Sequence, residues 1–121
     1  MIQLKKILKI DLYGGYILNI IVTNNIIKSI SKYSNKINYT DNIDPIIDGI
    51  HACHNNKSYK SYLFITPNGT LSTVSHEAFH ATLKIMEYIG AELNEGSEES
   101  YAYLLGYIID NILQTINKYN K

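Results

Sequence analysis

Five consecutive residues, His76-Glu77-Ala78-Phe79-His80, constrain this chain more than any other feature of it. The two histidines are four residues apart, so on a helix both imidazoles project from one face and reach one metal ion. Glu77 follows the first histidine and lies about 100° further round the helix. From there it can take a proton from a water that a zinc ion has made acidic. The pattern predicts a helix with a metal site and Glu77 as general base.

The residues around this motif favour a helix that packs on its opposite side. At about 100° per residue, the small and branched apolar residues group away from His76; they are Val74, Ala78, Ala81 and Ile85. Thr70 or Ser72 is suited to cap the helix, and Gly90 is suited to end it. The alternative is a chance match, in which the two histidines are an ordinary helical pair. Such a match is rare in a chain with four histidines, so we favour the metal site.

A third metal ligand is expected, because catalytic zinc sites usually have three protein ligands and a water. Glu99 is the best candidate, since the 19 residues after His80 are enough for a helix end, a turn and the start of another helix. Ala102 and Gly106 share its helical face, and two small residues would let the helices approach closely. The alternative is that Glu98 and Glu99 are first-turn acids that offset the helix dipole.

Cys53 and the histidines on either side of it form another group to consider. Cys53 is an alternative third ligand, although a free cysteine is more often a buried apolar residue. His51 and His54 are interpreted as solvated loop histidines. If that loop borders the site, one of them could stabilise a transition-state oxyanion.

Length and charge limit the classes of protein to which the chain can belong. A chain of 121 residues is expected to form one domain, residues 1–121. Eleven lysines balance eleven acids, which argues against a nucleic-acid partner or a basic membrane patch. No apolar run approaches the roughly 18–20 residues that span a bilayer, and one cysteine forms no intrachain disulfide. We therefore expect a cytoplasmic protein whose oligomeric state the sequence leaves open.

The order of the expected elements predicts an α+β fold. Strand-like runs at 2–12 and 17–23 flank Gly14-Gly15, which indicates a β-hairpin. The remaining segments predict a helix over 26–34 capped by Asn24 or Asn25, a loop over 35–45, strands within 46–53 and over 59–66, the motif helix, and a last helix from Ser97 to about residue 117. The expected architecture is a small antiparallel sheet of three or four strands packed against two long helices, with a short third helix.

The motif and the residues that follow it carry a family resemblance. Together with Ile89-Gly90 and the segment from Ser97 to Ile108, it resembles the small zinc metallopeptidases encoded by tailed bacteriophages. It is more distantly similar to the gluzincins, in which a glutamate from a following helix completes the site. The resemblance covers about residues 60–110 and implies zinc ligands at His76, His80 and Glu99, with Glu77 as base. Gluzincins often carry an aspartate where this chain has Tyr103, so the residues that orient their ligands are not shared.

This resemblance implies a zinc-dependent metallopeptidase that hydrolyses bonds in a peptide or protein substrate. If the chain is encoded by a phage, it would act in the cytoplasm of the infected host cell. The alternative is a non-catalytic, zinc-stabilised binding module of a phage assembly. The presence of Glu77 argues against that alternative, because a structural zinc site needs no base.

Overall fold

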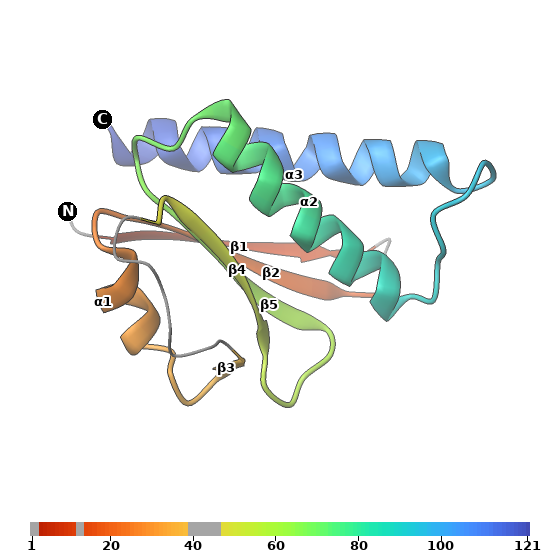
Figure 1. Ribbon diagram of the computed structural model, residues 1–121, viewed down its shortest axis with the longest axis horizontal. Helices are drawn as coiled ribbons and strands as arrows, with labels where there is room; N and C mark the ends of the chain where they lie inside the picture. The colour runs from red at the N-terminus through yellow and green to blue at the C-terminus, as the bar shows by residue number, and fades with distance from the viewer. Residues whose placement is uncertain (1–2, 12–13, 39–46) are drawn as a thin grey trace.

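The structure of the chain is a computed structural model that describes residues 3–11, 14–38 and 47–121 (Figure 1). Within these ranges the chain forms a sheet and three helices. The strands are β1 (Gln3–Ile10), β2 (Tyr16–Thr23), β3 (Ile37–Asn38), β4 (Gly49–His54) and β5 (Lys60–Ile65). The helices are α1 (Ile26–Ser31), α2 (Leu71–Tyr88) and α3 (Glu98–Tyr119). The predicted α+β class, with two long helices and one short helix, is confirmed. Most of the predicted 35–45 loop lies outside the described residues.

The sheet has the strand order β1-β2-β5-β4-β3 and is mixed. The predicted hairpin is formed by β1 and β2, with Gly14 and Gly15 both at a φ of 72° in its turn. Strand β4 pairs antiparallel with β5, but β2 pairs parallel with β5. The predicted antiparallel pairing is therefore found in three pairs of described strands, and the parallel pair β2–β5 makes the sheet mixed. The chain returns to β2 only after passing through α1, β3 and β4, and so long a connection allows the parallel direction.

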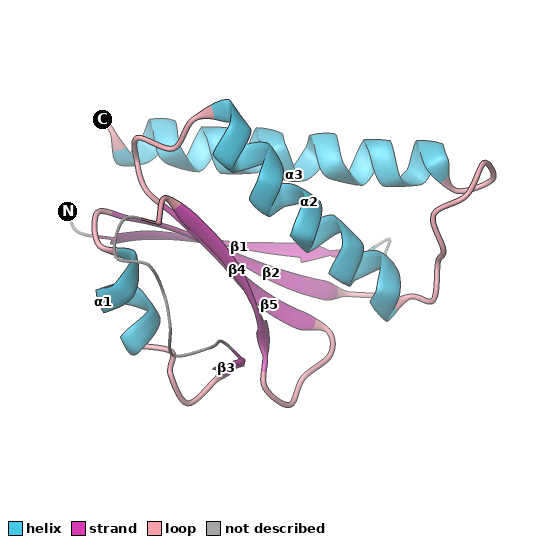
Figure 2. Ribbon diagram, in the orientation of Figure 1, coloured by secondary structure: helices cyan, strands magenta, loops and turns pink. Residues whose placement is uncertain are grey.

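Helices cover both faces of the central strands (Figure 2). On one face, α2 and α3 pack on alternate residues of β2, which are Leu18, Ile20 and Val22. On the other face, α1 packs on a smaller cluster that includes Ile21 and Phe64. Because water reaches neither face, β2 and β5 are buried along almost their whole length. These two buried strands form the surface on which the motif helix packs.

Helix α2 begins and ends where its sequence predicts. The Thr70 side chain accepts a hydrogen bond of 3.3 Å from the Thr73 N–H and caps the first turn. Gly90, at a φ of 77°, ends the helix, and the N–H of Ala91 donates to the carbonyl of Met86 across it. The predicted packing side is confirmed, since its four residues are fully buried: Val74, Ala78, Ala81 and Ile85. The histidine side is thereby turned toward solvent.

Helix α3 packs through its branched apolar residues and not through its small ones. The buried stripe consists of Leu104, Ile108, Ile112 and Ile116. Ala102 and Gly106 are exposed, and a Cβ built at Gly106 meets no described atom within 4 Å apart from its chain neighbours and the backbone of its own helix. The close helix approach expected through these two residues is therefore not formed. The large side chains bury more apolar area, so their side of α3 faces the core.

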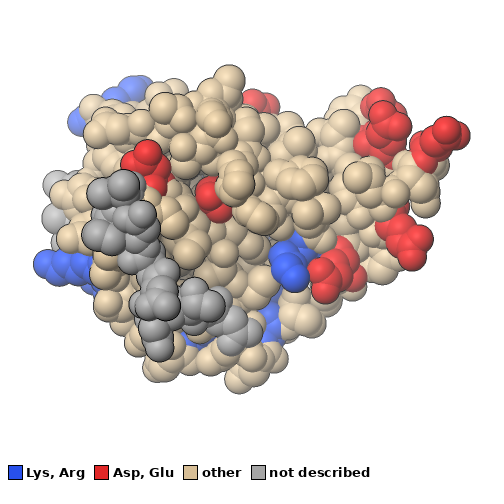
Figure 3. Space-filling model, viewed as in Figure 1, with Lys and Arg blue, Asp and Glu red and all other residues tan. Residues whose placement is uncertain are grey.

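Acidic side chains gather at one end of the molecule (Figure 3), where Figure 1 shows the loop between α2 and α3. This loop and the first turn of α3 carry four exposed acids: Glu92, Glu95, Glu98 and Glu99. The exposure of Glu98 and Glu99, both in the first turn of α3, fits acids that offset the dipole of that helix. Among the described residues, no helix has both the length and the apolar character needed to cross a membrane.

Candidate metal centre

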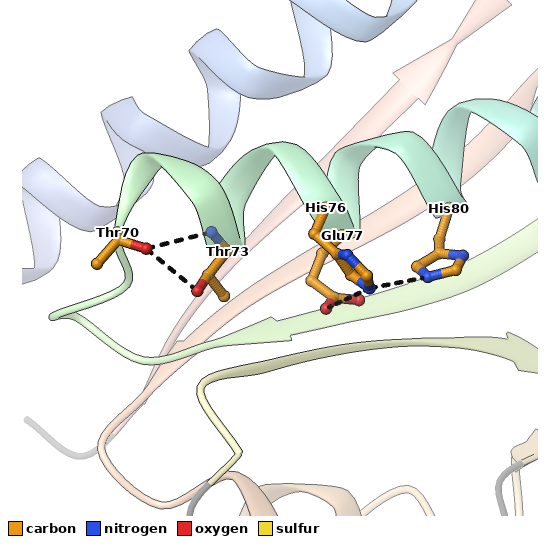
Figure 4. Close-up of polar contacts among 5 residues, drawn as sticks. All are labelled: Thr70, Thr73, His76, Glu77 and His80. Carbon is orange, nitrogen blue, oxygen red and sulfur yellow. Dashed lines mark hydrogen bonds and ion pairs between the residues drawn. The ribbon is translucent and has the colours of Figure 1, made fainter.

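The two motif histidines lie side by side on α2 and point to the same side of it (Figure 4). Their Nε2 atoms are 3.2 Å apart, and their ring centroids are 4.8 Å apart. Two nitrogens bound to one zinc ion at the usual bond length and a tetrahedral angle lie about 3.4 Å apart. The separation of His76 and His80 therefore fits a single ion. Both rings are exposed, so an ion can reach them from solvent.

Glu77 lies beside the histidine pair but is buried, with 7% of its surface exposed. Its Oε2 atom is 4.0 Å from Nε2 of His76. This separation is longer than the spacing of two tetrahedral ligands. It suits a carboxylate that contacts a water bound to the ion and does not bind the ion itself. Burial raises the pKa of Glu77, while His76, His80 and a hydrogen bond from the His51 backbone N–H oppose that rise. A carboxylate with a raised pKa is a stronger base.

The lack of a side chain at Gly49 on β4 leaves room for the side chain of Glu77. A Cβ at residue 49 would lie 3.0 Å from Cγ of Glu77 and 3.1 Å from Cγ2 of Thr73. Any other residue would therefore push α2 or the glutamate away from the strand. Sequence reasoning missed this role, although a glycine inside a strand pattern is a known signal of close approach.

A groove of about 700 Å³ runs between β4 and α2 past the histidines. One wall is formed by β4, and the other by the exposed side of α2. Lys84 and Glu87 lie further along α2 and form an ion pair of 3.2 Å. The groove has room for an extended ligand beside His76, Glu77 and His80.

His51 lies in this groove, on a strand, and so differs from the solvated loop histidine that was expected. Its Nε2 is 2.8 Å from the Ser61 hydroxyl, and Ser61 is fully buried. Burial lowers the pKa of His51 to about 3, and the positive charges of His80 and Lys84 add to this effect. The ring is therefore neutral at physiological pH. His54 extends from the other face of β4, where it stacks on Tyr62, and it does not border the site.

Glu99 and Cys53 lie outside the cluster formed by the motif. In the described part of the chain, the group of ligand atoms within 4.8 Å of one another comes from His76, Glu77 and His80. Glu99 is exposed in the first turn of α3, whose buried stripe faces elsewhere. Its role as a ligand stays a prediction, and this geometry does not support it. Cys53 is a free thiol that lines the groove two residues beyond His51.

Comparison of the chain with protein-family models, curated proteins and solved structures gave no match. Three side chains from one helix form a group that can hold a metal ion.

Proposed function

We propose that this protein is a zinc-dependent metallopeptidase, with zinc held by His76 and His80 and with Glu77 as general base. One observation carries the proposal: a buried carboxylate lies 4.0 Å from the nearer of two paired imidazoles whose spacing fits one ion. Acids are rarely buried, and an acid whose pKa is raised by burial beside two imidazoles is a candidate functional group.

Each residue of the group has a distinct task in peptide hydrolysis. When bound, zinc would polarise the substrate carbonyl and lower the pKa of a water molecule. Glu77 accepts the proton of the attacking water and passes it to the leaving amine. The backbone N–H of His51 donates to the Glu77 carboxylate. Burial of Glu77 raises its pKa, which strengthens it as a base.

The edge of β4 favours a peptide as the substrate of the proposed enzyme. Strand β3 pairs with β4 only at its far end, where Ile37 and Asn38 lie opposite His54 and Cys53. Among the described residues, no strand pairs with 49–52 on that side. An extended peptide can add to such an edge through main-chain groups other than the His51 N–H, which bonds to Glu77. This edge borders the groove that contains the histidines and Glu77.

The test compares wild type with Glu77→Gln, which keeps the shape of the side chain and removes its basicity. Zinc content is measured by mass spectrometry, and cleavage is measured on a quenched-fluorescence peptide library. We expect zinc in both proteins and cleavage by wild type alone. Glu98→Gln, an exposed acid in the first turn of α3 that does not line the groove, is the control and should cleave like wild type.

The outcome against the proposal is zinc in both proteins with cleavage by neither. That outcome would favour the non-catalytic binding module. The structure offers less support for a structural zinc, because structural sites are closed by four ligands. His76 and His80 are instead open to solvent.

A further inference from the structure

The proposed metal centre lacks one protein ligand. Catalytic zinc sites usually have three protein ligands, and the motif supplies two imidazoles. Glu77 is assigned as the general base, and its Oε2 lies 4.0 Å from Nε2 of His76, beyond the spacing of two tetrahedral ligands. The groove must therefore supply the third donor, or solvent must take its place.

Three further donor side chains line the groove, and they differ in their distance from the histidine pair. Glu87 lies seven residues beyond His80, about 10 Å along the helix, and is paired with Lys84. Cys53 lies two residues further along β4 than His51, about 7 Å away along the strand. His51 is the donor that contacts the cluster, because its backbone N–H bonds to Glu77. Its ring is also close enough to His80 for their charges to interact.

We propose that His51 is the third protein ligand of this metal centre, binding through Nδ1. This inference rests on the metal site proposed above and adds a residue from the sheet to the two from α2. The site would then join β4 to α2, so that metal binding links a strand with the helix above it.

The contact between His51 and Ser61 supports this assignment. A histidine that binds a metal through one ring nitrogen usually donates the other N–H to an acceptor in the protein. Nε2 of His51 is already 2.8 Å from the Ser61 hydroxyl, which leaves Nδ1 for the ion. Ser61 is fully buried, and its hydroxyl also bonds to the buried Tyr16 hydroxyl. These contacts hold the His51 ring in one orientation.

The exposed histidines supply the movement that the site needs. The three imidazoles do not form a group within 4.8 Å in this structure, so some rings must shift to bind one ion. His76 and His80 are exposed side chains on a helix and can change rotamer at little cost. His51 is fixed by Ser61. The ion would therefore be positioned by the strand, and the helix histidines would close on it.

The experiment titrates Co²⁺ into the full chain and follows its visible absorption, with affinity measured against a chelator. The main variant is His51→Gln, whose amide nitrogen can replace Nε2 at Ser61 but which has nothing in place of Nδ1. We expect its Co²⁺ affinity to fall more than tenfold and its visible band to weaken. His54→Gln, on the other face of β4, is the matched control and should bind like wild type.

Two further variants separate this inference from the proposed function. His80→Ala should lose Co²⁺ binding in any version of the site. Ser61→Ala should lower Co²⁺ affinity by about 10–100-fold, the usual effect of removing a partner of a metal ligand. The inference is overturned if His51→Gln binds Co²⁺ like wild type while His80→Ala does not; the two-histidine site then survives. If wild type itself binds no Co²⁺, both proposals fail. Circular dichroism without metal checks that every variant is folded.

Discussion

At the scale of single residues, the surroundings of Glu77 act on its pKa in opposite directions. Burial raises the pKa above that of the unfolded chain, and this effect is larger than the opposing effects of His76, His80 and His51. The folded state therefore binds more protons than the unfolded state near this pKa. Its stabilising contribution is complete below the unfolded pKa and is lost as pH rises through the folded pKa. Ionised Glu77 thus makes the folded protein less stable at neutral pH.

This sign gives a prediction for Glu77→Gln, which cannot ionise. With a chelator present, its thermal unfolding midpoint should exceed that of wild type at pH 7, and the difference should shrink as pH falls through the folded pKa toward the unfolded pKa. The measurement is thermal unfolding between pH 4 and pH 7. Glu87→Gln removes an exposed acid from the same helix and should show no such trend. Parallel curves for wild type and Glu77→Gln would contradict the argument.

A second prediction concerns the close contact at Gly49. An added methyl group would lie 3.0 Å from the side chain of Glu77, so Gly49→Ala should cost about 1–3 kcal/mol in the free energy of unfolding. It should also lower any peptidase activity, because Glu77 would move. Denaturant unfolding measures the first effect. Gly106→Ala is the control: it lies in open space within a helix and should stabilise by about 0.5–1 kcal/mol.

At the scale of elements, the way α3 packs determines whether Glu99 can reach the metal site. The buried stripe of α3 faces the core, and Glu99 lies among the exposed acids at the end of the molecule. We expect Glu99→Ala to change zinc affinity less than twofold, whereas His80→Ala should abolish binding. Isothermal titration calorimetry measures both. A large loss in Glu99→Ala would restore the original ligand prediction and require α3 to move on binding.

Local signals in the sequence predicted the elements well. Thr70 and Gly90 have the capping roles expected of them, and the buried side of α2 follows its apolar spacing. These features depend on neighbours within a few residues, which the sequence displays directly. The cluster of His76, Glu77 and His80 was predictable for the same reason, since one helix contains it.

The features that the sequence did not predict depend on contacts between distant residues. The small side chains of Ala102 and Gly106 favour a close helix contact, but the apolar stripe of α3 buries more surface and faces the core instead. His51 reached the site because β4 lies under α2, and no local pattern specifies that neighbour. Spacing fixes the face of a helix on which a residue lies, but packing decides what that face meets.

At the scale of the whole molecule, the parallel pair β2–β5 affects the order of folding. These strands lie side by side at the centre of the sheet, yet 36 residues separate Thr23 from Lys60. Closing so long a loop costs entropy before any contact repays it, so we expect this step to be slow. We expect helix α2, which carries the histidines, to pack on the central strands only after β2 and β5 have paired.

A metal ion that binds only after α2 has packed on the completed sheet can stabilise only the native state. If the rate-limiting transition state precedes the docking of α2 on the sheet, zinc should slow unfolding and leave the refolding rate unchanged. Stopped-flow chevrons with zinc and with chelator measure both rates. Faster refolding in zinc would mean that the histidines gather before the central strands meet. Because of the parallel pairing, metal binding comes late in folding. The bound ion would slow unfolding of the native state and would not speed its formation.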